Sequence, residues 1–161
     1  MIIWIIGKSG SGKSYYAKKI LKYFKNKKVF WLDGDEFRNF LSSNLGYSLK
    51  DRKQNSVNIQ NFCKYLDSKG YVVICSILSI FKNHQKKNRS IFSKYVQIYL
   101  KANQEILEKR NNKNIYTKRK NVVSKDLRFP TPYKSHLVLH NDFSKKNLKK
   151  NISKIIKFLN K

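Results

Sequence analysis

Gly7-Lys8-Ser9-Gly10-Ser11-Gly12-Lys13-Ser14 is the stretch that decides the fold of this chain. It follows an apolar run at residues 2–6 and precedes a helical pattern from residue 13 to about 25, so the pattern G-x-x-x-x-G-K-[ST] has its required strand–turn–helix context. Glycines let backbone N–H groups converge on phosphate oxygens, and the positive end of the following helix dipole faces the same anion. Lys13 adds a charge for the β and γ phosphates, and the Ser14 hydroxyl suits Mg²⁺. We therefore prefer a nucleoside triphosphate site to a chance Gly/Ser turn.

Composition sets outer bounds on the class of protein. The 161 residues include 36 Lys and Arg against 9 Asp and Glu, which gives a formal net charge of +27. This length suits one domain with one core, and 40% apolar residues argue against disorder. The charge points to anionic partners, and nucleic acid, an anionic membrane surface and polyphosphate substrates all fit it. Because no nucleic-acid recognition motif accompanies the charge, we do not expect a nucleic-acid partner.

The cysteines and the first apolar run indicate the cellular compartment. Cys63 falls on the apolar face of a predicted helix and Cys75 in a predicted strand, so we expect two reduced, buried thiols rather than a disulfide or a metal site. The apolar run at residues 2–6 is too short for a signal peptide or a membrane span. We therefore expect a cytoplasmic protein with no membrane partner.

Strand and helix patterns alternate along the whole chain. Further strands are predicted at residues 29–32, 71–75, 95–100 and 136–140, and further helices at 50–69, 83–94, 103–110 and from Ser144 onward. No repeat, linker or domain boundary interrupts them. This order predicts a single domain over residues 1–161 with an α/β fold, in which a central parallel sheet forms the middle of three layers.

Two segments leave an alternative open. Residues 111–130 are rich in Lys and Asn and show little apolar periodicity, which fits either a disordered loop or a mobile basic lid; opposite a polyphosphate site we favour the lid. The terminal helix has a basic outer face that would suit a membrane surface. Its apolar spacing favours docking on the core.

An acidic cluster follows the second predicted strand. Asp33, Asp35 and Glu36 lie within four positions in a chain that has few carboxylates. In doubly wound sheets, ligands bind at the carboxyl ends of the strands, and this cluster lies at such an end. We favour a role with Mg²⁺ or an acceptor hydroxyl, and keep a turn or a helix cap as the alternative.

Several motifs in a fixed order resemble the adenylyl-sulfate kinase family. Besides the glycine-rich loop they are Leu32-Asp33-Gly34-Asp35-Glu36-Phe37-Arg38, Leu45-Gly46-Tyr47-Ser48, Asp51-Arg52-Lys53-Gln54-Asn55, Ile77-Leu78-Ser79-Ile80-Phe81 and Leu137-Val138-Leu139. The resemblance runs from residue 2 to about 141. It implies a P-loop kinase fold with a lid, which transfers the γ-phosphoryl group of ATP to the ribose 3′-hydroxyl of adenosine 5′-phosphosulfate (APS).

The resemblance also implies roles on the ATP side. Residues 7–14 would bind ATP as co-substrate, with Lys13 as a catalytic residue, while Ser14 and Asp35 would hold the cofactor Mg²⁺. Asp35 would also stand beside the acceptor hydroxyl as the candidate general base, with Asp33 supporting it. Arg110 matches a basic position on the nucleotide side, where it would lie over a bound purine.

On the acceptor side the resemblance carries over a second set of residues. These are Asp35, Arg38, Tyr47, Arg52, Asn55, Ser79, Phe81 and Lys118. Arg38, Arg52 and Asn55 would grip the acceptor nucleotide, and Tyr47 takes the place of a Phe that stacks on its base. Ser79 matches a serine proposed to be transiently phosphorylated, but we prefer that it orients the acceptor, because direct in-line transfer needs no covalent intermediate.

This chain departs from the family pattern mainly on the acceptor side. The Ser-Pro-Phe-Arg segment of the family is Ser79-Ile80-Phe81-Lys82 here, which removes a rigid proline and a bidentate guanidinium. A second basic position of that segment is Gln85, and no Arg follows soon after Asn55. The F-T-G-I-D pattern of the lid is absent from residues 121–129, where Phe129 is the candidate to stack instead. His140 stands where an Asp usually follows the last strand.

Two acceptors therefore stay open. APS is one, and cytidine diphosphoramidate, which family members working on capsule-type metabolites phosphorylate at the same hydroxyl, is the other. A hypothesis of another class is a nucleic-acid-associated P-loop protein whose charge is its working surface, but an acidic cluster beside the loop would repel a phosphate backbone. We expect small-molecule nucleotides as partners and leave a homodimer open.

Overall fold

A five-stranded parallel sheet forms the centre of the structure, a computed structural model that describes residues 1–25, 27–41, 43–110 and 129–160. The strands are β1 (Ile2–Ile6), β2 (Val29–Asp33), β3 (Val72–Ile77), β4 (Tyr95–Lys101) and β5 (Leu137–His140). They lie in the order β2-β3-β1-β4-β5, and every neighbouring pair is parallel. All carboxyl ends therefore meet at one edge, where the glycine-rich loop leaves β1.

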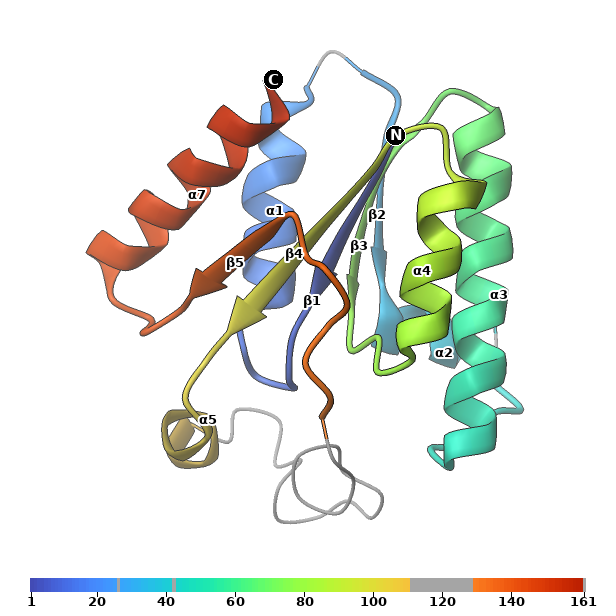
Figure 1. Ribbon diagram of the computed structural model, residues 1–161, viewed down its shortest axis with the longest axis horizontal. Helices are drawn as coiled ribbons and strands as arrows, with labels where there is room; N and C mark the ends of the chain where they lie inside the picture. Colours follow the sequence, from blue (N-terminus) through green and yellow to red (C-terminus); the bar gives the residue numbers. More distant parts are fainter. Residues whose placement is uncertain (26, 42, 111–128, 161) are drawn as a thin grey trace.

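Helices cover both faces of this sheet, which gives the three layers (Figure 1). The described helices are α1 (Lys13–Tyr23), α2 (Gly34–Leu41), α3 (Leu49–Ser68), α4 (Lys82–Ile91), α5 (Gln104–Arg110) and α7 (Lys145–Leu159). α1 and α7 lie on one face, and α3 and α4 on the other. The predicted fold class, a three-layer α/β fold around a parallel sheet, is confirmed.

Strand β1 divides the core between the two faces because successive side chains of a strand point to opposite sides. Ile3 and Ile5 pack with Ile20 of α1 and Ile155 of α7. Ile2, Trp4 and Ile6 pack with residues of α3 on the other side. All five residues of β1 are buried, which is the expected pattern for a central parallel strand and holds the loop that follows it rigidly.

Helix α2 was not predicted from the sequence. It begins at Gly34, directly after β2, so the acidic residues Asp35 and Glu36 occupy its first turn, where the helix dipole stabilises negative charge. Phe37 anchors the helix in the core at 8% exposure. The acidic cluster thus opens a helix at the ligand-binding edge of the sheet.

The remaining elements agree with the sequence analysis within a few residues. Ser144 caps α7 by accepting a hydrogen bond from the backbone N–H of Asn147, and α7 docks against α1 as expected.

The two cysteines are free and buried, with their Sγ atoms 3.4 Å apart, and burial raises the pKa of Cys75. Among the described residues, no helix combines the length and apolar character needed to span a membrane.

Gly34 should be required at the junction of β2 and α2. A Cβ atom added there would lie 2.9 Å from Ile77 Cγ2 and 3.3 Å from Ile77 Cβ. Because Ile77 is a buried strand residue, we expect Gly34→Ala to lower the free energy of unfolding in urea by about 1–3 kcal/mol. Ile77→Ala removes Cγ2, the closest of these atoms. The double variant should therefore lose less stability than the two single variants lose together. An unchanged stability in the single variant would contradict this packing.

Candidate active site

The glycine-rich loop between β1 and α1 depends on glycine for its shape. Gly10 and Gly12 have φ angles of 78° and 93°, in the left-handed region that disfavours side chains. A Cβ atom on Gly7 would lie 2.7 Å from the Leu100 carbonyl oxygen, a backbone atom that cannot move aside. The pattern recognised in the sequence therefore forms a tight loop that leads into the N-terminus of α1.

The two lysines of the loop are held by hydrogen bonds. Lys13 Nζ donates to the carbonyl oxygen of Lys8 at 2.8 Å, so its ammonium group lies over the loop. Lys8 Nζ donates to Gln104 Oε1 of α5 at 2.8 Å. The site thus combines the N-terminus of a helix, a glycine-rich backbone and an ammonium group at one point, which together suit a polyphosphate.

A carboxylate lies directly beside this loop. Ser14 Oγ donates to Asp33 Oδ2 at 2.6 Å, and Ser76 Oγ donates to the same oxygen at 3.0 Å. Trp31 Nε1 in turn donates to Ser76 Oγ at 3.0 Å. The other oxygen of Asp33 accepts the backbone N–H of Asp35 at 3.0 Å. The acidic cluster and the phosphate-type loop therefore form one site.

These oxygen atoms fit a hard divalent cation. Among the residues that the structure describes, no three His, Cys, Asp or Glu side chains gather as a metal cluster. Mg²⁺ commonly binds through one or two protein oxygens, with water and substrate phosphates as its other ligands. The sequence analysis named Ser14 and Asp35 for this role, and the carboxylate that contacts Ser14 is that of Asp33.

The two arginines predicted to bind the acceptor enclose Tyr47. The guanidinium carbons of Arg38 and Arg52 lie 5.0 and 5.4 Å from the centre of the Tyr47 ring. Arg38 Nη1 donates to the Gly46 carbonyl oxygen at 2.7 Å, and Arg52 Nε donates to that of Tyr47 at 3.0 Å. Burial and the charge of Arg38 lower the pKa of Arg52. Tyr47 and Asp35 act in the opposite direction and raise this pKa by less.

Asn55 lies near this group on α3 with 4% of its surface exposed, and within the described structure its Oδ1 atom has no hydrogen-bond partner. The buried Nε atom of Arg38 has none either. Because burying an unpaired polar atom costs free energy, such atoms indicate a place where a ligand or water completes the hydrogen bonding.

Ser79 lies in the loop after β3 in a strained conformation, with a φ angle of 47°. Trp4 Nε1 donates to its Oγ atom at 3.1 Å, and Gln85 Nε2 donates to its carbonyl oxygen at 2.7 Å. Gln85 also accepts the backbone N–H of Tyr133 at 2.6 Å, and the side chain is fully buried. Gln85 therefore joins the Ser79 loop to the chain that follows the predicted lid.

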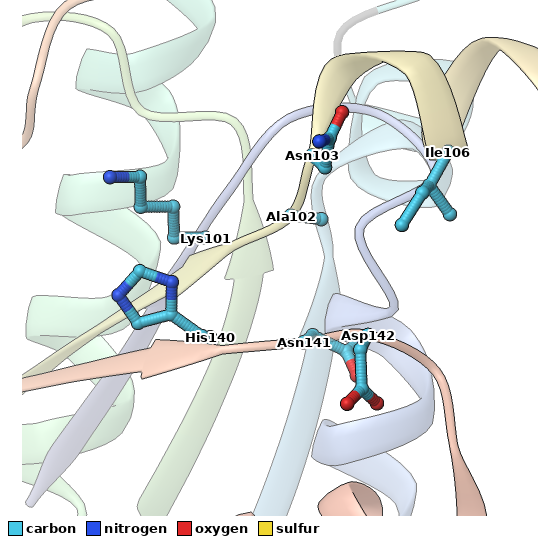
Figure 2. Close-up of a pocket in the computed structure, with 7 residues that line it drawn as sticks. All are labelled: Lys101, Ala102, Asn103, Ile106, His140, Asn141 and Asp142. Atoms are coloured by element: carbon cyan, nitrogen blue, oxygen red, sulfur yellow. The ribbon is translucent and has the colours of Figure 1, made fainter.

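A cavity of about 370 Å³ opens beside the loop, between the ends of β4 and β5 (Figure 2). It is lined by Lys101, Ala102, Asn103, Ile106, His140, Asn141 and Asp142. Arg110, which was predicted to lie over a purine, packs its guanidinium carbon 4.2 Å from the centre of the Phe143 ring, next to this lining.

The structure brings some of the predicted site residues into direct contact. Ser14 contacts Asp33, and Arg38 and Arg52 enclose Tyr47 as described above. Phe81 packs against His84, with ring centres 5.3 Å apart. Lys118 and most of the predicted lid lie outside the described residues.

Three supporting residues escaped the sequence analysis as members of the site. Gln85 appeared there only as a departure from a basic family position, Asn141 was not singled out, and Phe143 was not considered. Asn141 and Phe143 follow the end of a predicted strand, and this was the only local signal for them. Their contacts join parts of the chain that are far apart in sequence, so no local pattern reveals these contacts.

Comparisons with known proteins point to one family. A family model described as adenylylsulphate kinase matches residues 1–140. An adenylyl-sulfate kinase of Clostridium kluyveri is 36% identical over 129 residues, which cover 78% of this chain and 65% of that protein. A cytidine diphosphoramidate kinase of Campylobacter jejuni is 34% identical over 168 residues, covering 98% of this chain and 95% of that one.

A solved structure shares the fold. The Mycobacterium tuberculosis APS kinase in complex with AMPPNP and APS matches with a TM-score of 0.89 and 24% sequence identity, over 99% of this chain and 97% of that one. At this identity the likeness supports the fold alone. The P-loop kinase fold expected from the sequence is confirmed.

Gln85→Leu tests whether the buried amide holds the Ser79 loop. The substitution leaves the Ser79 carbonyl and the Tyr133 N–H without their partner, and each such group costs about 1–3 kcal/mol. We expect urea unfolding to show a loss of at least about 2 kcal/mol. Gln54→Leu is the matched control, because Gln54 is exposed on α3 and its change should stay within about 0.5 kcal/mol. Equal effects of both variants would refute this role.

Proposed function

Because this chain belongs to the adenylyl-sulfate kinase family of P-loop kinases, we propose that it transfers the γ-phosphoryl group of ATP to the ribose 3′-hydroxyl of a nucleotide acceptor. The observation that carries the proposal is the 2.6 Å contact between Ser14 of the phosphate loop and Asp33 of the acidic cluster. This contact supports the proposal because it brings a hydroxyl and a carboxylate, both suitable ligands for Mg²⁺, together beside the glycine-rich loop. Small-molecule nucleotides are therefore the proposed partners, in the cytoplasm where ATP is available.

ATP would lie along the loop with its phosphates at the backbone N–H groups of residues 7–14. Lys13 neutralises charge on the β and γ phosphates, and the nucleoside extends toward the cavity beside Arg110 and Phe143. Ser14 and Asp33 would hold Mg²⁺, which when bound neutralises the charge that spreads over the phosphoryl oxygens. These groups supply positioning and electrostatic stabilisation, which account for most of the acceleration of phosphoryl transfer.

The acceptor would lie between Asp35 and the two arginines that enclose Tyr47. Arg38, Arg52 and Asn55 bind its anionic and polar groups, and Asp35 accepts the proton of the 3′-hydroxyl. The 3′ oxygen then bonds to the γ phosphorus while the bond from that phosphorus to its bridging oxygen breaks, and ADP leaves. Since Ser79 Oγ already accepts the Trp4 N–H, its own proton is available to orient the acceptor.

APS and cytidine diphosphoramidate both satisfy this proposal. Each is named by a relative of this chain that is more than 30% identical. Where the family pattern has a basic residue, Gln85 is buried and bonded to Ser79 and Tyr133, so it supports the loop and supplies no charge to the acceptor. The acceptor site here is therefore less cationic than the family pattern, although the ATP side is intact.

An ADP-release assay tests the proposal directly. ATP and Mg²⁺ are supplied together with APS, cytidine diphosphoramidate or a simple nucleoside monophosphate. We expect ADP to form when one of the first two is present, and ³¹P NMR of the product to show the new phosphate on the 3′ oxygen. ADP release that no acceptor stimulates, combined with salt-sensitive binding to nucleic acid, would instead support a nucleic-acid-associated protein. Light scattering tests whether the chain forms the homodimer that the sequence analysis left open.

Lys13→Ala should reduce turnover with the active acceptor by about 10²-fold or more, the scale of one preorganised charge at developing negative charge. Lys22→Ala is the control, because Lys22 is exposed in the last turn of the same helix and should leave turnover unchanged. Steady-state kinetics measure both. A Lys13→Ala enzyme that keeps nearly full activity would show that the ATP site lies elsewhere.

Arg52→Ala should act on the acceptor and spare ATP. The loss of a charge-assisted hydrogen bond, worth about 1.5–3 kcal/mol, predicts a KM for the acceptor that rises by about tenfold or more. The KM for ATP should change by less than about twofold. Lys50→Ala removes an exposed charge nearby on the same helix and controls for general electrostatics. An equal loss of ATP affinity would contradict the placement of Arg52.

A further inference from the structure

We propose that Asn141 is a positioning residue that orients the backbone of the phosphate-binding loop from behind. The inference rests on the proposed function only in taking residues 7–14 as the site that binds ATP. Asn141 follows β5 directly and is 3% exposed. Its place in the sequence indicates only that it follows a strand, because the loop that it contacts is 130 residues away.

Both ends of the Asn141 amide are held. Nδ2 donates to the carbonyl oxygen of Ser11 at 3.0 Å. Oδ1 accepts the backbone N–H of Phe143 at 3.1 Å and the hydroxyl of Tyr16 at 3.4 Å. Because a backbone N–H can only donate, the oxygen must face Phe143 and the NH₂ group must face Ser11. The backbone N–H of Asn141 is also held, by the Lys101 carbonyl oxygen at 2.8 Å.

The contact with Ser11 determines the direction of the next N–H group. In a trans peptide, the carbonyl oxygen and the following N–H lie in one plane and point in opposite directions, and the described chain contains no cis peptide. With the Ser11 carbonyl drawn into the protein by Asn141, the N–H of Gly12 points the other way, toward the open side of the loop. An N–H group in that direction can donate to a phosphate oxygen.

The Asn141 amide packs closely against the backbone of Gly12. Gly12 has a φ angle of 93°, and a Cβ atom added there would lie 3.0 Å from Asn141 Nδ2. A side chain at position 12 would therefore both strain the loop and displace the amide. Position 12 therefore requires glycine for two reasons, which are its φ angle and the closeness of the Asn141 amide.

A second buried amide provides a matched control. Asn151 of α7 is 4% exposed and donates through Nδ2 to Tyr16 Oη at 3.1 Å and to the His140 carbonyl oxygen at 2.8 Å. It belongs to the same hydrogen-bond network as Asn141 and is equally buried. No contact between Asn151 and the loop is found in the described structure, so it shares the packing role of Asn141 without the positioning role.

The test compares Asn141→Asp with Asn151→Asp. Aspartate has nearly the shape of asparagine, but at position 141 it sets a carboxylate oxygen against the Ser11 carbonyl oxygen and removes the donor. We expect the dissociation constant for ATP, measured calorimetrically with the full chain, to rise about tenfold or more, with Asn141→Ala intermediate because it removes the donor without adding repulsion. Asn151→Asp should change the dissociation constant for ATP by less than about twofold, even if the melting temperature of this variant is lower.

The outcomes separate this inference from the proposed function. If Asn141→Asp and Asn141→Ala bind ATP as the unmodified chain does, or if Asn151→Asp weakens binding as much as Asn141→Asp, the positioning role is wrong. Inorganic triphosphate serves as a second probe of the loop alone. Should the unmodified chain bind triphosphate but not ATP, the proposed function fails while the variants still test Asn141 with triphosphate. Binding of neither probe overturns both.

Discussion

The hydrogen bond between Ser14 and Asp33 is the interaction on which the site depends. It joins the start of α1 to the end of β2, two strands away from β1 in the sheet. The strand between them, β3, contributes Ser76, which pairs in register with Asp33 and donates to the same carboxylate oxygen. Parallel pairing brings all three ends to one edge, so the register of the sheet sets the distance between the phosphate loop and the acidic cluster.

Both parts of the site contain paired polar groups and buried polar atoms without a partner in the described structure. The lysines of the phosphate loop and the Asp33 carboxylate are already hydrogen-bonded within the protein. In the described structure, Ser11 Oγ of the loop is buried without a partner, and so are Asn55 Oδ1 and Arg38 Nε. Burial of such atoms is costly unless a ligand or water pairs with them, so these atoms mark places in both parts of the site where binding can add hydrogen bonds.

Buried amides support two loops of the site. Gln85 holds the Ser79 loop on one side of the sheet, and Asn141 holds the phosphate loop on the other. A neutral amide donates and accepts at once, so it can join two backbone segments without the large desolvation cost of a buried ion. In a chain with a net charge of +27, amides also avoid adding to the repulsion among its cations.

Local patterns in the sequence were sufficient for the alternation of strands and helices, for the phosphate loop and for the serine cap of α7, because each depends on residues a few positions apart. Helix α2 was missed, since its start at Gly34 depends on close packing against Ile77 of β3.

The family resemblance named Arg38, Tyr47 and Arg52. That the two guanidinium groups enclose the Tyr47 ring is visible only in the structure. Only the tertiary structure decided that Asp33 contacts Ser14 and that Asn141 holds Ser11, because both contacts follow from the order in which the strands assemble.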